Sequence, residues 1–179
     1  DRGEALRTAE RYAQRVREDL DGEPNARIMA YASSLRGTPS RLPVIADEMI
    51  GRDDELRVAT SLIERSDLSL LTLTGAGGTG KTRLAIQVAR AVEPRVDRVW
   101  FVDLSTLRDS AGVIPAVAFA CGVQPEPGRD PVDAIASFLA GRRVLIVLDN
   151  FEQVVDAAGA VARLVNAAPN VTLLITSRM

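Results

Sequence analysis

The sequence contains no histidine and a single cysteine, Cys121. Without histidine the chain cannot build a Ser-His-Asp catalytic triad or a histidine-ligated metal site. One cysteine excludes an internal disulfide and is typical of the reducing cytoplasm. Because Cys121 lies in an apolar, helical-looking run and has no histidine to activate it, we expect a buried small hydrophobic residue rather than a nucleophile.

Aromatic residues are also scarce, at 4%, so the 46% of hydrophobic residues must form a mostly aliphatic core. The 22 basic and 24 acidic residues leave a net charge of −2, and no overall basic field attracts nucleic acid or an anionic membrane. No apolar run has the length of a membrane span, and no signal-peptide pattern is present. We therefore expect a cytoplasmic globular protein, whose 179 residues allow one ordinary domain, or one domain with an appendage.

A glycine-rich stretch, residues 75–82, carries the clearest chemical signal. It follows an apolar run at 68–74 and precedes a helical-looking run at 83–92, which is the strand–loop–helix order of a P-loop. The stretch matches GxxxxGK[ST] at every fixed position, whereas a chance match is expected on the order of once in a hundred chains of this length. The predicted nucleotide-binding residues are Gly75, Ala76, Gly77, Gly78, Thr79, Gly80, Lys81, Thr82 and Arg83.

Each residue type in this stretch suits a phosphate ligand. Glycine permits positive φ and a close backbone approach, so that successive N–H groups point into one concavity. The dipole of the following helix adds positive potential there. Lys81 supplies a point charge for the outer phosphates, and the Thr82 hydroxyl can ligate a Mg²⁺ that also holds phosphate oxygens. The sequence therefore predicts a site for a nucleoside triphosphate with magnesium.

A second signal is the fully apolar run 144–148, which ends in Asp149. Such runs are common, but this one lies about 67 residues after the P-loop (149 − 82) and has a further apolar strand beyond it. Together these features indicate a Walker B strand, with Asp149 next to the P-loop and holding the magnesium through water.

The residue after Asp149 is unusual for a fast ATPase. Asn150 stands where many such enzymes carry a glutamate that activates water, and a neutral amide can orient water but cannot accept its proton. Glu152 is the next carboxylate, with a plain helix N-terminal role as the alternative. Asp103 ends the predicted strand at 98–104 and either faces the ligand edge of the sheet or caps the next loop.

Apolar patterning predicts strands near 68–74, 98–104, 143–148 and 171–176. Helices are predicted between and before them, with Asp53 as one N-cap and Asp130 as another, and with Phe138 facing inward. The alternation indicates an α/β fold: an incomplete P-loop NTPase parallel sheet with helices on both faces, preceded by a helical hairpin. The predicted helices cover 53–65, 83–92, 110–123, 130–140 and 154–168.

The N-terminal part has a different pattern. Amphipathic runs at 1–20 and 25–35 predict an αα-hairpin, followed by a segment whose glycine and prolines are typical of a linker. The predicted division is a hairpin at 1–36, a linker at 37–49 and a P-loop NTPase domain at 50–179. Because the chain begins with Asp1 and ends directly after a predicted strand, we expect a fragment of a longer protein, with the NTPase domain truncated at its C-terminus.

Five motifs follow the order found in the STAND class of signal-transducing NTPases, which includes NB-ARC proteins. IGRDDEL at 50–56 resembles the motif that opens that domain, and LDNFE at 148–152 resembles the Walker B segment of bacterial STAND regulators. The terminal TSR at 176–178 resembles their sensor. Residues 4–24 resemble the end of a bacterial transcriptional activation domain (BTAD), a helical-repeat module.

The resemblance implies roles for further residues. Ile50, Gly51 and Arg52 would pack near the adenine, and Arg178 would reach the γ-phosphate, with a plain surface arginine as the alternative. Catalytic roles would fall to Lys81, Asp149, Asn150 and Arg178. The resemblance also implies a fifth strand beside 68–74 that this chain lacks, so that we expect an exposed sheet edge and a fragment prone to aggregate.

By resemblance, the function is that of an ATP/ADP-binding switch in a cytoplasmic transcriptional regulator. ADP would hold it closed, ATP would open it for self-association or for a partner protein, and slow Mg²⁺-dependent hydrolysis would reset it. DNA would be contacted only by domains absent from this chain. The alternatives are a regulatory NTPase module of a signalling enzyme such as a kinase or nucleotide cyclase, a stand-alone ATPase, and a scaffold that has lost its nucleotide.

Overall fold

The structure is a computed structural model that describes residues 11–12, 42–44, 51–124 and 128–178. The chain divides into two units, Asp1–Ser40 and Arg41–Met179. Of the first unit only Arg11 and Tyr12 are described, and both are helical. The predicted hairpin with its BTAD resemblance, most of the predicted linker, and Ile50 lie outside the described residues.

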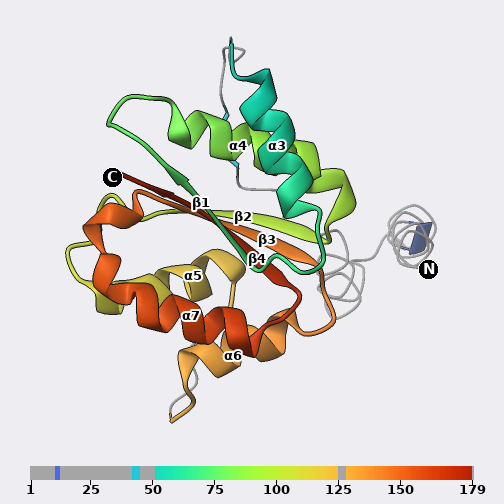
Figure 1. Cartoon of the computed structure of the whole chain (residues 1–179). Coiled ribbons are helices and arrows are strands. Elements are labelled where there is room, and N and C mark those ends of the chain that lie inside the picture. The colour runs from blue at the N-terminus through green and yellow to red at the C-terminus, as the bar shows by residue number, and fades with distance from the viewer. Residues whose placement is uncertain (1–10, 13–41, 45–50, 125–127, 179) are drawn as a thin grey trace. The chain divides into compact units, whose positions relative to one another are not determined.

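Four parallel strands form one sheet in the second unit, in the order β1-β4-β3-β2 (Figure 1). All four predicted strands are confirmed, with ends within two residues of the prediction. The strand expected beside β1, at 171–176, is indeed its neighbour. The bounds are Leu70–Thr74 for β1, Arg98–Asp103 for β2, Val144–Asp149 for β3 and Val171–Ser177 for β4.

Helices cover both faces of the sheet, as predicted: α3 and α4 on one, α5, α6 and α7 on the other (Figure 1). None of the helices in the described part of the chain combines the length and the apolar character that crossing a membrane requires. The α-helices are α3 (Asp53–Ile63), α4 (Lys81–Val92), α5 (Val113–Cys121), α6 (Pro131–Leu139) and α7 (Ala158–Ala167). The short 3₁₀ turns are η1 (Glu93–Arg95), η2 (Ser110–Gly112), η3 (Phe151–Gln153) and η4 (Val155–Ala157).

Strand β3 lies in the middle of the core, and all six of its residues are buried. Successive side chains of a strand point to opposite faces. Ile146 and Leu148 therefore join the cluster beneath α5–α7, whereas Leu145 and Val147 join the cluster beneath α3 and α4. A strand covered on both faces needs a continuous apolar run, which explains why this segment of the sequence shows no polar alternation.

Three local predictions can be compared with the structure. Asp130 caps α6 as expected, its side chain accepting a hydrogen bond from the Val132 N–H at 2.8 Å. The N-cap prediction for Asp53 was wrong: Arg52 holds that position without a side-chain bond, and Asp53 begins the helix, where a carboxylate still interacts favourably with the dipole. The prediction that Phe138 faces inward was wrong: the buried face of α6 is formed by Val132, Ala134, Ile135 and Leu139, and Phe138 is 39% exposed, with the Arg142 guanidinium 5.1 Å from its ring centroid.

Cys121 is buried against α5–α7, as predicted for a small hydrophobic residue. Burial raises the pKa of its thiol to about 12, so the thiolate is scarce at neutral pH.

At the sheet edge, β1 pairs only with β4 among the described strands, and Leu70 is 39% exposed. The structure thus has the exposed edge expected from the sequence, while aggregation of the fragment stays a prediction.

The double-sided burial of β3 leads to a stability prediction. Leu145→Ala and Leu148→Ala should each lower the free energy of unfolding by about 2–5 kcal/mol, because each leaves a cavity on one face of the sheet. Urea unfolding followed by circular dichroism measures this. Phe119→Ala is the control: its side chain is 79% exposed, and the change should be about 0.5 kcal/mol or less. Equal losses in all three variants would contradict the assigned core.

Candidate functional site

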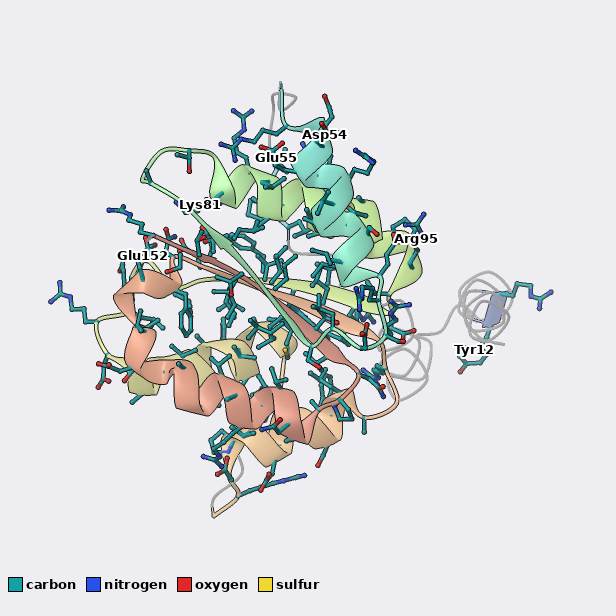
Figure 2. All side chains as sticks on the ribbon, in the orientation of Figure 1. Tyr12, Asp54, Glu55, Lys81, Arg95 and Glu152 are labelled. Atoms are coloured by element: carbon teal, nitrogen blue, oxygen red, sulfur yellow. The ribbon has the colours of Figure 1, made fainter. Side chains whose placement is uncertain are left out.

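The candidate site lies where the carboxyl ends of the four parallel strands meet. Parallel strands place these ends at one edge, where ligands of open α/β sheets bind. Lys81, from the start of α4, and Glu152, from the turn after β3, lie at this edge (Figure 2). The P-loop stretch connects β1 to α4 there, so segments far apart in sequence converge on one place.

The glycine-rich loop has the backbone form that its sequence requires. Gly78 and Gly80 have φ of 76° and 81°, in the left-handed region where a side chain would be strained. Gly80 is the N-cap of α4, with no side-chain hydrogen bond, and the first turn of the helix carries no acidic residue. The unpaired N–H groups of this turn and the helix dipole therefore remain available to an anion.

Lys81 lies across the beginning of the loop. Its ammonium donates hydrogen bonds to the carbonyl oxygens of Gly75 at 2.9 Å and Ala76 at 2.8 Å. The Thr79 hydroxyl also donates to the Ala76 carbonyl, at 2.9 Å. These bonds tie the end of the loop back to its beginning and keep the positive charge of Lys81 there. The next helix residues, Thr82 and Arg83, are half-buried.

Asp149 is a buried charged group at this edge, with only 3% of its surface exposed. Its carboxylate accepts hydrogen bonds from the Thr82 hydroxyl at 2.8 and 3.0 Å and from the Thr176 hydroxyl at 2.5 Å. The Asn150 amide nitrogen adds a third donor, at 3.0 Å. A buried charge needs such partners, because burial without them is costly.

The donor atoms around Asp149 fit a magnesium ion. Mg²⁺ prefers oxygen ligands, and it is usually bound by one or two protein groups together with waters and phosphates. The Thr82 hydroxyl and the Asp149 carboxylate are such oxygens, and they lie in direct contact. Within the described ranges no three or more acidic or cysteine side chains gather into a group that could hold a metal ion by themselves.

Asn150 links two strand ends. Its backbone is left-handed, with φ of 64°, and its amide nitrogen donates to Asp103 at 3.1 Å as well as to Asp149. Asp103 also accepts a hydrogen bond from the Ser105 N–H at 2.9 Å. It therefore caps the following loop and, through Asn150, also contacts the site. Burial opposes ionisation of Asp103, but the hydrogen bonds from Ser105 and Asn150 outweigh it and hold its pKa below the ordinary value.

Arg178 follows β4 and is paired rather than free. Its Nε lies 3.0 Å from one Glu152 oxygen, and its backbone N–H donates to the other at 3.2 Å. A Cβ atom added at Gly77 would lie 3.8 Å from the Arg178 guanidinium, so this cation lies beside the P-loop.

The motif at 50–56 is only partly described. Gly51 has φ of 78°, and Arg52 is half-buried at the N-cap of α3. Arg52 and Lys81 line one open hollow of about 510 Å³ between α3, β1 and the start of α4. Arg52 thus shares a hollow with the P-loop lysine, and its role near the base stays a prediction.

Sequence reasoning missed one residue and one contact at this edge. Thr176 was read only as part of a strand and a motif, although the register pairs Leu148 with Ile175 and so sets Thr176 level with Asp149. A threonine ending an apolar strand was the available signal. The pairing of Glu152 with Arg178 had no sequence signal, because nothing local relates residues 26 positions apart.

Residues 64–176 match the AAA domain family, and the chain belongs to that family. The sheet and the P-loop connection are those of a P-loop NTPase fold. A stretch of 110 residues is 48% identical to the "Putative HTH-type transcriptional regulator" of Mycobacterium tuberculosis, covering 61% of this chain and 12% of that protein. The regulatory protein AfsR of Streptomyces griseus is 32% identical over 153 residues, covering 79% of this chain and 15% of AfsR.

Solved structures show the same fold at low identity. The Cdc6p structure from Pyrobaculum aerophilum has a TM-score of 0.56 at 17% identity, covering 79% of this chain and 42% of that one. The Aeropyrum pernix ORC2 protein, in ADPNP–ADP complexes, has a TM-score of 0.60 at 14% identity, covering 78% and 45%. The chain spans less than half of either structure, and only 12% to 15% of the two regulators named above.

The contact between Asn150 and Asp103 is testable by titration. Asn150→Ala should raise the pKa of Asp103 towards its ordinary value, because one of its donors is lost. A carboxyl with a lowered folded-state pKa stabilises the fold above its unfolded-state pKa, and this contribution is lost as the pH falls through the folded-state value. Carboxyl-detected NMR measures the pKa. Asn170→Ala, exposed at the opposite end of the sheet, should leave it unchanged.

Proposed function

We propose that the chain is the ATP/ADP-binding switch module of a STAND-type bacterial transcriptional regulator. The observation that carries the proposal is the hydrogen-bonded contact between Thr82, on the P-loop helix, and Asp149, at the end of β3. This contact joins the two sequence motifs of a P-loop NTPase into one oxygen-lined site at the ligand edge of the sheet. The ADPNP–ADP complexes of the ORC2 relative support a nucleotide as the ligand.

The proposed pose follows from the positions of the charged groups. The N–H groups of residues 75–82 and the start of α4 surround the phosphates, and Lys81 exchanges its two carbonyl partners for phosphate oxygens. The base lies towards the hollow lined by Arg52. Arg178, beside Gly77, reaches the outer phosphate with its planar fork.

Thr82 and Asp149 would hold the magnesium ion, Thr82 directly and Asp149 through water. When bound, the ion would neutralise part of the phosphate charge. Thr176 and Asn150 hold Asp149 in place for this role, because their bonds fix both of its oxygens.

Slow hydrolysis follows from the absence of a free carboxylate at position 150. Asn150 can orient a water molecule but cannot take its proton. Glu152, the next candidate, is engaged with Arg178 through both oxygens. A slow reaction suits a switch, because the ATP-bound state must persist long enough to be read.

The regulator assignment rests on the relatives and on the proposed division of the chain. A transcriptional regulator and AfsR share this segment by sequence. We assign residues 1–36 to the end of a BTAD, 37–49 to a linker and 50–179 to the switch domain. The switch would act in the cytoplasm, with self-association or a partner protein favoured by ATP, and DNA would be contacted by other parts of the regulator.

Nucleotide binding is the first test. Wild-type protein with magnesium should bind ATP and ADP with micromolar affinity, about 8 kcal/mol, and Lys81→Ala and Asp149→Ala should lose most of it. Isothermal calorimetry measures this. Arg90→Ala is a control, since it removes a cation from the same helix at a residue whose side chain bonds the Pro43 carbonyl instead. Wild-type affinity in Lys81→Ala would contradict the phosphate role of Lys81, and no binding by the wild type would instead support a scaffold that has lost its nucleotide.

Lys81 offers an independent test, because it is the only lysine in the sequence. An amine-directed acylating reagent should modify Lys81 and the N-terminal amine, and Mg·ATP should protect Lys81 alone. Peptide mass spectrometry separates the two sites. Equal protection of both amines, or of neither, would argue against a phosphate ligand at Lys81.

Turnover distinguishes a switch from a working ATPase. Phosphate release by the wild type should be well below one per second, within the slow end of measured enzyme rates. Several turnovers per second, abolished in Asp149→Ala, would assign the chain to the stand-alone ATPases instead.

A further inference from the structure

Both carboxylate oxygens of Glu152 contact Arg178. One oxygen lies 3.0 Å from the Arg178 Nε, and the other accepts the Arg178 backbone N–H at 3.2 Å. The Glu152 side chain is 18% exposed, against 64% for Arg178. The carboxylate is therefore the fixed partner, held in the η3 turn after β3, while the arginine is the partner with room to move.

The place of this pair gives it a consequence for ligand binding. Arg178 lies beside Gly77 of the P-loop. Its partner Glu152 lies at the same edge of the sheet as Lys81 (Figure 2). Arg178 thus lies between the negative charge of Glu152 and the proposed phosphate site. That charge neutralises the guanidinium that would otherwise attract an anion.

A triphosphate and a diphosphate should feel this charge differently. Only the triphosphate carries the outer phosphate for which Arg178 is the proposed partner. That phosphate must draw the guanidinium away from Glu152 or share it, whereas a diphosphate can leave the pair intact. A residue alters the preference between two ligands only through an interaction that differs between them. The competition for Arg178 differs, because only the triphosphate has an outer phosphate.

We propose that Glu152 sets the ratio of ATP affinity to ADP affinity at this site, by competing with the outer phosphate for Arg178. This inference rests on the proposed function, since it requires nucleotide at the P-loop. Glu152 is then a specificity-determining residue, and it keeps the diphosphate form populated until ATP is in excess.

The test is Glu152→Gln, which removes the charge but keeps an oxygen that can accept the Arg178 N–H. Calorimetry with magnesium should show the affinity for a non-hydrolysable ATP analogue rising about threefold or more, with the ADP affinity nearly unchanged, since a partly exposed ion pair contributes modestly. Asp156→Asn, exposed in the next turn, is the control for the same change in net charge and should leave the ratio unaltered.

A double-variant comparison tests whether the effect passes through Arg178. In an Arg178→Ala background, Glu152→Gln should no longer raise the preference for the ATP analogue, because the shared partner is gone. An NMR readout adds direct observation: the Arg178 Nε–H signal should keep its position on adding ADP and shift on adding the ATP analogue. Urea unfolding of each variant checks that the fold is retained.

The outcomes separate the two proposals. If neither nucleotide binds the wild type, the proposed function fails and this inference fails with it. If both bind but Glu152→Gln leaves the ratio unchanged or lowers it, the inference alone is overturned, and Glu152 serves to hold Arg178 in position for the ligand instead.

Discussion

The buried carboxylate of Asp149 is the constraint on which the ligand edge of the sheet depends. A charge that is 3% exposed must be hydrogen-bonded, and its donors come from three places: Thr82 on α4, Thr176 on β4 and its own neighbour Asn150. Satisfying that charge fixes the start of α4 against the ends of β3 and β4. The loop between β1 and α4 is then short and must turn sharply, which explains the left-handed Gly78 and Gly80.

The same edge balances opposite charges within a small space. Lys81, Arg178 and the N-terminus of α4 are groups that would attract an anion. The Gly75 and Ala76 carbonyls hold Lys81, Asp149 holds the first turn of α4 through Thr82, and Glu152 holds Arg178. A phosphate ligand therefore has to replace existing interactions, and its affinity reports the difference between two sets of contacts. Replacing or moving one carboxylate, such as that of Glu152, would change this free-energy difference. A P-loop site could be adapted to switching in this way.

Switching and rapid hydrolysis place different demands on this architecture. Fast hydrolysis needs a base near the outer phosphate, whereas a switch needs unequal affinities for two nucleotides and a long-lived bound state. Here the position after Asp149 carries an amide, and Glu152 is committed to Arg178. Both features favour the switch. AfsR and the mycobacterial regulator carry a related segment within much longer chains, so the response to such a switch would be made elsewhere in those proteins.

The sequence alone was sufficient for the elements that local patterns encode. The four strands, the loop at 75–82, the Asp130 cap and the buried Cys121 all follow from periodicity, glycine placement and short-range hydrogen bonding. Only the tertiary structure decided the partners of Asp149 and the pairing of Glu152 with Arg178. Those contacts join residues that are distant along the chain. Such contacts depend on the order and the register of the strands. No short stretch of sequence encodes strand order or register, because both result from the packing of the whole sheet.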